Sequence, residues 1–336
     1  MNIYDISQKA GVSIATVSRV LNNSPNVSAK TKNKVLSVME ENSYTPNVYA
    51  RGLGLNSMNT IGILCADSSD IYLANAVYFL ERELRQQGYS SVLCCTGYDL
   101  ENKQNCMKLL LSKRVDAIIL VGSNFVEKKA SDNAYIFEAS KDIPVMIING
   151  YIKHSNIYCI YCDEYQAVYE AASLLIKEGY KEPIYLYRSL SYSGIQKKEG
   201  FLKAIKENQL EHHNRTYECT GDLGEVKNYL LSLYDGGKHF DAIITSDDEL
   251  AIGAVKFAKA KNLNIPRDIS IIGHNNSKIA RYCEPELTSV DNKLETLCIH
   301  TVTTLMRIFD HKNVASKTIF SAELITRETT NFRITE

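Results

Sequence analysis

Apolar and polar side chains recur with helical spacing between Val12 and Asn22, close to the start of the chain. At about 100° per residue, Val17, Val20 and Leu21 fall on one side of a helix. The other side carries mostly small, polar or basic side chains: Ile14, Ala15, Ser18, Arg19 and Asn22. Short side chains let a helix enter the major groove of DNA, where an arginine can bond a guanine edge or a phosphate. This face is therefore either a recognition helix for DNA or the solvated face of a small helical bundle.

Three short helices are expected to position this face. Residues 3–10 have apolar side chains at helical spacing, and Gly11 follows where a left-handed residue ends a helix. Ser13 is suited to cap the next helix. A third helix is expected from Ser28, its N-cap, to about residue 42. Its inward side chains would be Val35, Leu36 and Met39.

The charge of the chain is distributed unevenly. The 336 residues are enough for two or more domains, and the formal net charge is −1. Residues 1–60, however, hold six basic and three acidic side chains. A basic N-terminal segment on a slightly acidic remainder is compatible with an attached DNA-binding module.

The sequence gives little support for a membrane span or a metal site. The polar N-terminus is unlike a signal peptide, and no apolar run reaches the roughly 20 residues of a membrane span. We therefore expect a cytoplasmic protein without a membrane partner. Most of the nine cysteines lie in apolar, strand-like runs, which favours buried reduced thiols. Cys159 and Cys162 have the spacing of half a zinc site, but no second such pair exists, so we expect no metal and no cofactor.

The pattern changes after residue 60. Short apolar runs such as TIGILCA and ISIIG do not alternate with polar residues, which is typical of strands buried on both faces of a parallel sheet. Amphipathic stretches between these runs predict the β-α-β order of a doubly wound fold. Two patterns recur: Gly-Tyr between a helix and a strand at 88–89 and 179–180, and Asp-Ala-Ile-Ile at 116–119 and 241–244. They predict two similar α/β lobes with a small-ligand cleft between them.

Taken in order, these parts resemble the lac-repressor and gal-repressor (LacI-type) family of bacterial transcription regulators. The most specific motifs are AGVSIATVSRVLN at 10–22 and PNVYAR at 46–51. Later segments agree, among them SDDELAIGAV at 246–255 and IPRDISIIGHN at 265–275. The resemblance runs nearly from end to end of the chain. It implies a regulator of transcription, a repressor in the first instance with an activator as the alternative, that binds a pseudo-palindromic operator in double-stranded DNA as a homodimer.

The resemblance also implies a division of the chain. Residues 1–45 would be an all-α helix-turn-helix headpiece and residues 46–57 a hinge linker. Residues 58–336 would be an α/β core for effector binding and dimerisation, made of two doubly wound lobes like those of periplasmic binding proteins. The first lobe would comprise residues 58–161 and 290–319, and the second residues 162–289 and 320–331.

By the same resemblance, Ile14, Ala15 and Arg19 would face base edges. The residues that would meet the DNA backbone are Tyr4, Ser13, Thr16, Ser18, Asn22 and Asn47. In the linker, Ala50 would also contact DNA, and Leu53 matches a leucine that wedges into a central minor-groove step and kinks the duplex. The alternative for Leu53 is an ordinary linker leucine. Because Gly52 and Gly54 flank it, a helix here would be too weak to persist without DNA.

In the cleft, the resemblance implies a small polar effector, most commonly a carbohydrate. The residues implied around it are Ile71, Tyr72, Asn149, Asp163, Lys197, Leu223, Asp247 and Asn275. The family pattern has Asn-Asp where this chain has Asp247-Asp248, Asp in place of Asn275, and Arg in place of Lys197. We therefore expect the effector-binding carboxylate to have moved from position 275 to 247. Lys197 lacks the planar fork that holds hydroxyls or a carboxylate with two bonds.

Other functions remain open at this point. The cleft could serve a phosphoprotein corepressor or no ligand at all, and a two-lobed core is equally typical of a solute-binding protein. Enzyme activity finds no support: the chain has no Walker loop, no H-E-x-x-H and no G-x-S-x-G. The neighbouring carboxyls of Asp247 and Asp248 would diverge and form a poor acid–base pair.

Overall fold

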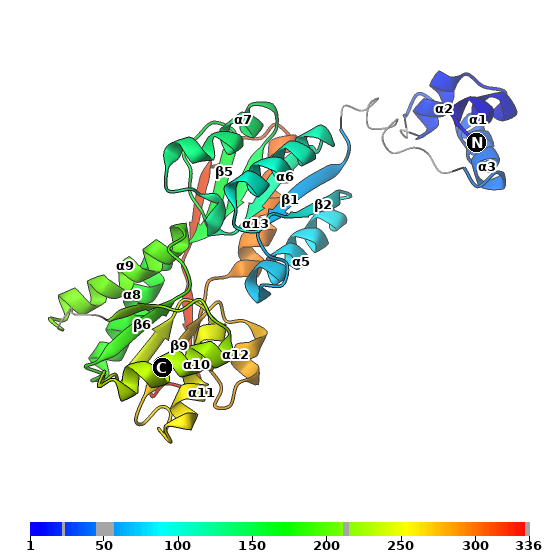
Figure 1. Ribbon diagram of the computed structural model, residues 1–336. Helices are drawn as coiled ribbons and strands as arrows, with labels where there is room; N and C mark the ends of the chain where they lie inside the picture. The colour runs from blue at the N-terminus through cyan, green and yellow to red at the C-terminus, as the bar shows by residue number, and fades with distance from the viewer. Residues whose placement is uncertain (22–23, 45–56, 211–214, 333–336) are drawn as a thin grey trace.

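The computed structural model of the chain describes residues 1–21, 24–44, 57–210 and 215–332. A small helical headpiece, residues 1–44, precedes a much larger core of two α/β lobes (Figure 1). The predicted architecture, a helix-turn-helix domain followed by two doubly wound lobes, is confirmed.

Three short helices form the headpiece: α1 (Ile3–Ala10), α2 (Ile14–Leu21) and α3 (Ala29–Glu41). Their ends lie at residues whose chemistry favours a helix terminus. Gly11 ends α1 in the left-handed region with a φ of 60°, and the Ser28 hydroxyl accepts the Thr31 N–H at the start of α3.

The headpiece has a core of its own. It consists of Ile6, Ala10, Val17, Val20, Val35 and Met39. The expectation for Leu36 was wrong, because this side chain is 43% exposed. Val35, Val38 and Met39 set the inward face of α3, and Leu36 lies about 100° around the helix from Val35.

The first lobe contains a parallel sheet with the strand order β11-β5-β4-β3-β1-β2. The strands are β1 (Thr60–Cys65), β2 (Ser90–Cys95), β3 (Ala117–Val121), β4 (Val145–Ile148), β5 (Ile157–Cys162) and β11 (Lys317–Phe320). Buried side chains of α5 (Ile71–Gln86) and α13 (Leu294–Phe309) cover one face of the sheet. Those of α6 (Leu100–Ser112) and α7 (Ala134–Asp142) cover the other. Two 3-10 turns, η1 (Ser123–Phe125) and η2 (Ala130–Asn133), follow β3.

The second lobe repeats this arrangement with the order β12-β10-β9-β8-β6-β7, in which only β12 is antiparallel to its neighbour. The strands are β6 (Pro183–Tyr187), β7 (Thr216–Glu218), β8 (Ala242–Thr245), β9 (Ser270–His274), β10 (Thr288–Asp291) and β12 (Glu323–Ile325). One face packs on α10 (Leu223–Asp235), α11 (Asp248–Ala260) and α12 (Lys278–Tyr282). The opposite face packs on α8 (Glu164–Lys177) and α9 (Tyr192–Glu207).

Within the described residues the chain passes between the lobes three times: after β5, after β10 and after β11. Strand pairing shifts the expected boundaries slightly. The first passage begins at Asp163, and β10 belongs wholly to the second sheet, so the boundary expected at residue 290 falls inside a strand. The residues of these passages lie where the two lobes meet.

The two recurring sequence patterns have different structural meanings. Asp116 accepts the N–H groups of Met58 and Thr60 beside β1, and Asp241 accepts those of Lys181 and Glu182 beside β6. Since β1 and β6 hold equivalent places in the two sheets, this pattern is a true repeat of the lobe.

The Gly-Tyr pattern is a local one. Gly88 and Gly179 take positive φ values and end α5 and α8 with the same left-handed turn. The strands that follow are an edge strand, β2, and an inner strand, β6, which are not equivalent in their sheets. This similarity therefore arises from the shared chemistry of a helix end.

The cysteine pair considered for a metal lies in the interior. Cys159 and Cys162 are both buried on β5, and burial raises the pKa of Cys159 to about 11. Among the described residues, no group of three or more His, Cys, Asp or Glu side chains could hold a metal ion. In the same part of the chain, no helix combines the length and the hydrophobicity that a membrane span requires.

A close contact between α8 and α9 gives a test of the packing. A Cβ atom on Gly200 would lie 2.2 Å from the backbone oxygen of Tyr165, so Gly200→Ala must push the helices apart. We expect a loss of about 1–3 kcal/mol in the free energy of unfolding, measured by urea denaturation. Gly224→Ala is the control, because its Cβ would meet only a side-chain oxygen at 3.2 Å. Equal stability of the two variants would contradict this packing.

Candidate functional site

The outer face of α2 is free of contacts with the headpiece core. Val17 and Val20 are buried, whereas Ile14, Ala15 and Arg19 are exposed. The Ser13 hydroxyl accepts the Thr16 N–H at 3.2 Å, as expected for the cap of this helix. The same helix thus packs on α1 and α3 through one side and presents small, apolar and basic side chains on the other.

The remaining headpiece residues of the predicted DNA interface are placed as follows. Tyr4 is 66% exposed, Ser13 is exposed, and Thr16 and Ser18 are partly buried. Four further predicted contacts lie outside the described residues: Asn22, Asn47, Ala50 and Leu53. The hinge linker and its leucine wedge therefore stay predictions.

Between the lobes lies a cavity of about 630 Å³, walled by the loops that follow the carboxyl ends of the strands. Five of the predicted effector residues line it: Tyr72, Asn149, Lys197, Asp247 and Asn275. Ile71 instead lines an adjoining cavity of about 430 Å³, and Asp163 lines a small one of about 20 Å³. Leu223, at the start of α10, is not among the residues that line these three cavities.

Equivalent asparagines enter the large cavity from the two lobes. Asn149 follows β4 with a φ of 60°, and Asn275 follows β9 with a φ of 93°. Asparagine tolerates this left-handed conformation better than most residues. The Asn149 amide donates to the Tyr72 hydroxyl, and Asn275 accepts from the Asn292 amide at 3.1 Å. The strand ends thus fix both amides at the cavity wall.

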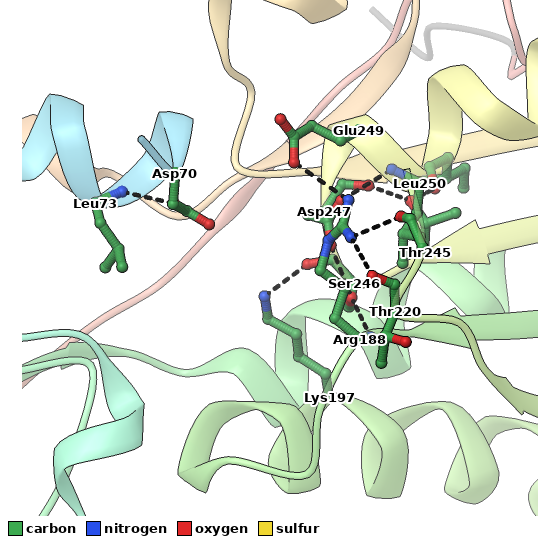
Figure 2. A network of polar contacts seen from close by, with 12 residues as sticks. Asp70, Leu73, Arg188, Lys197, Thr220, Thr245, Ser246, Asp247, Glu249 and Leu250 are labelled. Carbon is green, nitrogen blue, oxygen red and sulfur yellow. Dashed lines mark hydrogen bonds and ion pairs between the residues drawn. The ribbon is translucent and has the colours of Figure 1, made fainter. Parts of the chain in front are cut away.

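Arg188, which sequence analysis did not single out, lies at the centre of the second lobe's wall (Figure 2). Its Nε donates to Asp247 at 3.0 Å, and a terminal nitrogen donates to Glu249 at 3.2 Å. The other terminal nitrogen donates to the carbonyl oxygens of Gly221 and Thr220 at 3.1 and 3.5 Å. Asp247 is therefore part of an ion-pair network, although we expected its carboxylate to be available for the effector. Arg188 directly follows β6, and this position at a strand end is the signal that could have identified it.

Lys197 lines the cavity but is almost completely buried. It is 7% exposed and donates to the backbone oxygen of Ser246 at 3.0 Å. Its Nζ also lies 3.8 Å from the carboxylate of Glu164, which is 2.5 Å from Nε2 of the fully buried His274. We call Glu164, Lys197 and His274 the buried charge cluster.

The electrostatics of the buried charge cluster favour an ionised Glu164. Burial opposes its ionisation, but Lys197 and hydrogen bonding outweigh burial and lower its pKa to about 2. Burial and then Lys197 lower the pKa of His274, so its imidazole stays neutral beside the carboxylate. Asn292, on the second passage between the lobes, donates to Glu164 at 3.3 Å. The cluster therefore links the start of α8 to the residue that leads into α13.

Asp248 has a structural role separate from that of Asp247. It accepts the N–H and hydroxyl of Ser277, both at 2.7 Å, and the Ser289 hydroxyl at 2.5 Å. Asp247 instead accepts the Leu250 N–H at the start of α11 and bonds Arg188. The two carboxylates diverge, as the sequence predicts. Burial raises the pKa of Asp248 to about 6 despite its three donors.

A helix-turn-helix headpiece joined to a two-lobed core with a polar cavity defines a transcriptional regulator that binds DNA and responds to a ligand. Residues 2–47 match the family model of the bacterial regulatory proteins of the lacI family. Residues 58–325 match that of the periplasmic binding proteins and sugar binding domain of the LacI family. The chain belongs to the LacI family of bacterial regulatory proteins.

Individual relatives agree with this assignment. An HTH-type transcriptional regulator of Lachnoclostridium phytofermentans is 59% identical over 333 residues, which cover 99% of this chain and 100% of that protein. The HTH-type transcriptional repressor PurR of Mannheimia succiniciproducens is 28% identical over 97% of each chain. The crystal structure of the lac repressor dimer bound to operator and the anti-inducer ONPF has the same fold, with a TM-score of 0.88 and 23% identity over 98% of both chains.

The buried charge cluster makes a prediction about pH. Glu164→Gln leaves Lys197 without its carboxylate, so we expect a loss of about 3–5 kcal/mol in the free energy of unfolding at pH 7. The folded-state pKa of Glu164, about 2, lies below its ordinary value of 4.5. Its contribution is therefore complete above pH 4.5 and is lost as the pH falls through 2.

Denaturation of the wild type and the variant between pH 7 and the lowest pH at which both fold would measure this difference. We expect the gap in stability to narrow steadily below about pH 4.5. Glu170→Gln, an exposed change on the same helix, is the control and should leave stability within about 0.5 kcal/mol of the wild type. A pH-independent gap for Glu164→Gln would contradict an ionised cluster.

Proposed function

We propose that the protein represses transcription by binding a pseudo-palindromic operator as a homodimer, under the control of a small polar effector in the interlobe cavity. The observation that carries this proposal is the outer face of α2, where exposed Ile14, Ala15 and Arg19 stand opposite a buried Val17 and Val20. Such a helix is held rigidly by its inner side while its outer side enters the major groove. The protein acts by binding, without a chemical step.

Homodimer formation follows from the size of the headpiece. One helix of eight residues spans only a few base pairs, so a single headpiece specifies a half-site. Two headpieces related by two-fold symmetry read the two halves of an operator and roughly double the binding free energy. The lac repressor structure, a dimer on its operator, supports this arrangement by its fold.

The effector is proposed to be a carbohydrate. The description of the matched core family includes sugar binding, and the cavity of about 630 Å³ has the size of a small-molecule site. Its walls come from both lobes, so a ligand that contacts both favours one arrangement of the lobes over the other. Through the linker after the headpiece, that preference would change the spacing of two DNA-bound headpieces.

Arg19 gives the sharpest test of the DNA interface. An operator is first selected from random duplexes with the wild-type protein, and affinities are then measured at one salt concentration for each single base-pair change. Arg19→Ala should cost about 1–3 kcal/mol, roughly ten- to a hundredfold in affinity, and should abolish the preference at one base pair of each half-site.

Lys9→Ala is the matched control, because it removes the same charge from the headpiece. Lys9 lies in the last turn of α1 and donates to Asn42, away from the outer face of α2. It should weaken binding to all sequences similarly and leave base preferences intact. If Arg19→Ala kept every base preference, α2 would not be the recognition helix.

A further inference from the structure

Both basic side chains that line the interlobe cavity are bonded to other groups of the protein. Four carboxylates line it, those of Asp67, Asp70, Asp247 and Glu249, against two basic groups. Every nitrogen of the Arg188 guanidinium donates to a protein oxygen, and Lys197 is held by Ser246 and Glu164. A phosphate or carboxylate entering the cavity would find excess negative charge and no free cation among these residues.

Two helix N-termini at the cavity, those of α5 and α11, are closed to anions, whereas that of α9 is capped by the neutral hydroxyl of Ser191, which accepts the Gly194 N–H at 3.4 Å. The start of a helix attracts negative charge when its N–H groups are free. Asp70 accepts the Leu73 N–H at 2.8 Å at the start of α5, and Asp247 accepts the Leu250 N–H at 2.9 Å at the start of α11. In both cases a carboxylate of the chain itself occupies the place that an anionic ligand would take. Figure 2 shows these two caps on opposite sides of the cavity, one from each lobe.

Two residues of the cavity wall hold a buried acceptor without a donor. Asn292 is 1% exposed, and its amide nitrogen is directed to Glu164 and Asn275, which leaves its oxygen buried without a partner. Asn149 is 5% exposed, and its amide oxygen is likewise buried without a partner. Asp70 accepts the Leu73 N–H through one oxygen, and burial together with nearby Asp247 raises its pKa, although Arg188 opposes this rise. An unpaired buried acceptor costs about 1–3 kcal/mol, which a ligand hydroxyl would recover.

We propose that the effector is a carbohydrate without any anionic group, whose hydroxyls donate to Asp70 and to the oxygens of Asn149 and Asn292. This inference rests on the proposed function, since it specifies the ligand of the same cavity. It excludes sugar phosphates and sugar acids. Among the described residues of the cavity wall, the one buried donor without a partner is the Asn124 amide nitrogen, and it accords with a hydroxyl, because a hydroxyl both donates and accepts.

The test uses the full-length protein and a panel of matched sugars. Glucose, galactose, xylose, cellobiose and maltose are compared with their phosphorylated and uronic-acid counterparts by thermal shift, because a ligand of the native state raises the melting temperature. Glucosamine is added as a cationic member. Calorimetric titration then gives the Kd of each hit. We expect an uncharged sugar to bind at least tenfold more tightly than its phosphorylated counterpart.

Asp70→Asn assigns the discrimination to a residue. Asparagine caps a helix as well as aspartate does, so the start of α5 is kept while the charge is removed. We expect the ratio of affinities between the uncharged and the phosphorylated sugar to fall on the order of tenfold. Asp222→Asn is the matched control, since Asp222 caps α10 in the same way but is not among the residues lining the cavity. It should leave the ratio unchanged.

The outcomes separate the two proposals. If a sugar phosphate or acid bound as tightly as its uncharged counterpart, the charge inference would fall while a carbohydrate effector would stand. Tightest binding by glucosamine, weakened by Asp70→Asn, would support the proposal, because glucosamine carries no anionic group. Were no member of the panel to bind, the carbohydrate effector and this inference would both be wrong. An unchanged ratio in Asp70→Asn would overturn the role of Asp70.

Discussion

The ionised Glu164, buried where the chain first enters the second lobe, constrains the rest of the core. A carboxylate with 4% exposure is stable only with partners, and Lys197, His274 and Asn292 all converge on it. These partners come from α9, from the end of β9 and from the second passage between the lobes. One buried charge therefore holds together the part of the second lobe that adjoins the first lobe.

The same constraint determines the chemistry of the cavity. Because Lys197 neutralises Glu164, it is not available to a ligand, and because the amide nitrogen of Asn292 donates to Glu164, its oxygen is left buried without a donor. Asp247 and Glu249 likewise form ion pairs with Arg188, so its charge is already neutralised within the protein. The cavity wall is thus rich in acceptors and poor in free cations. The preference among ligands that we propose follows from ion pairs formed within the protein.

Local signals in the sequence predicted the helices and strands well, whereas contacts between residues far apart in the sequence could not be predicted. Gly11, Ser13 and Ser28 mark helix ends, which depend only on residues close in sequence. The apolar runs of the inner strands do not alternate with polar residues, so the sequence identified them as strands buried on both faces. The partner of Asp247 could not be predicted in this way. Arg188 is far from it in sequence and meets it only because β6 and β8 pair in the sheet. Family resemblance placed Lys197 at the cavity, but its burial against Glu164 and Ser246 depends on contacts between residues far apart in the sequence.

Like charges from the two lobes line opposite sides of the cavity. Asp70 stands on the first lobe, and Asp247 and Glu249 stand on the second, so closure of the lobes brings like charges together. Arg188 offsets part of this repulsion, but it already serves both carboxylates of its own lobe. A ligand that donates hydrogen bonds to both sides lowers the energy of the closed state more than that of the open one. That difference in affinity is the free energy available for control of DNA binding, and no ligand can shift the equilibrium by more.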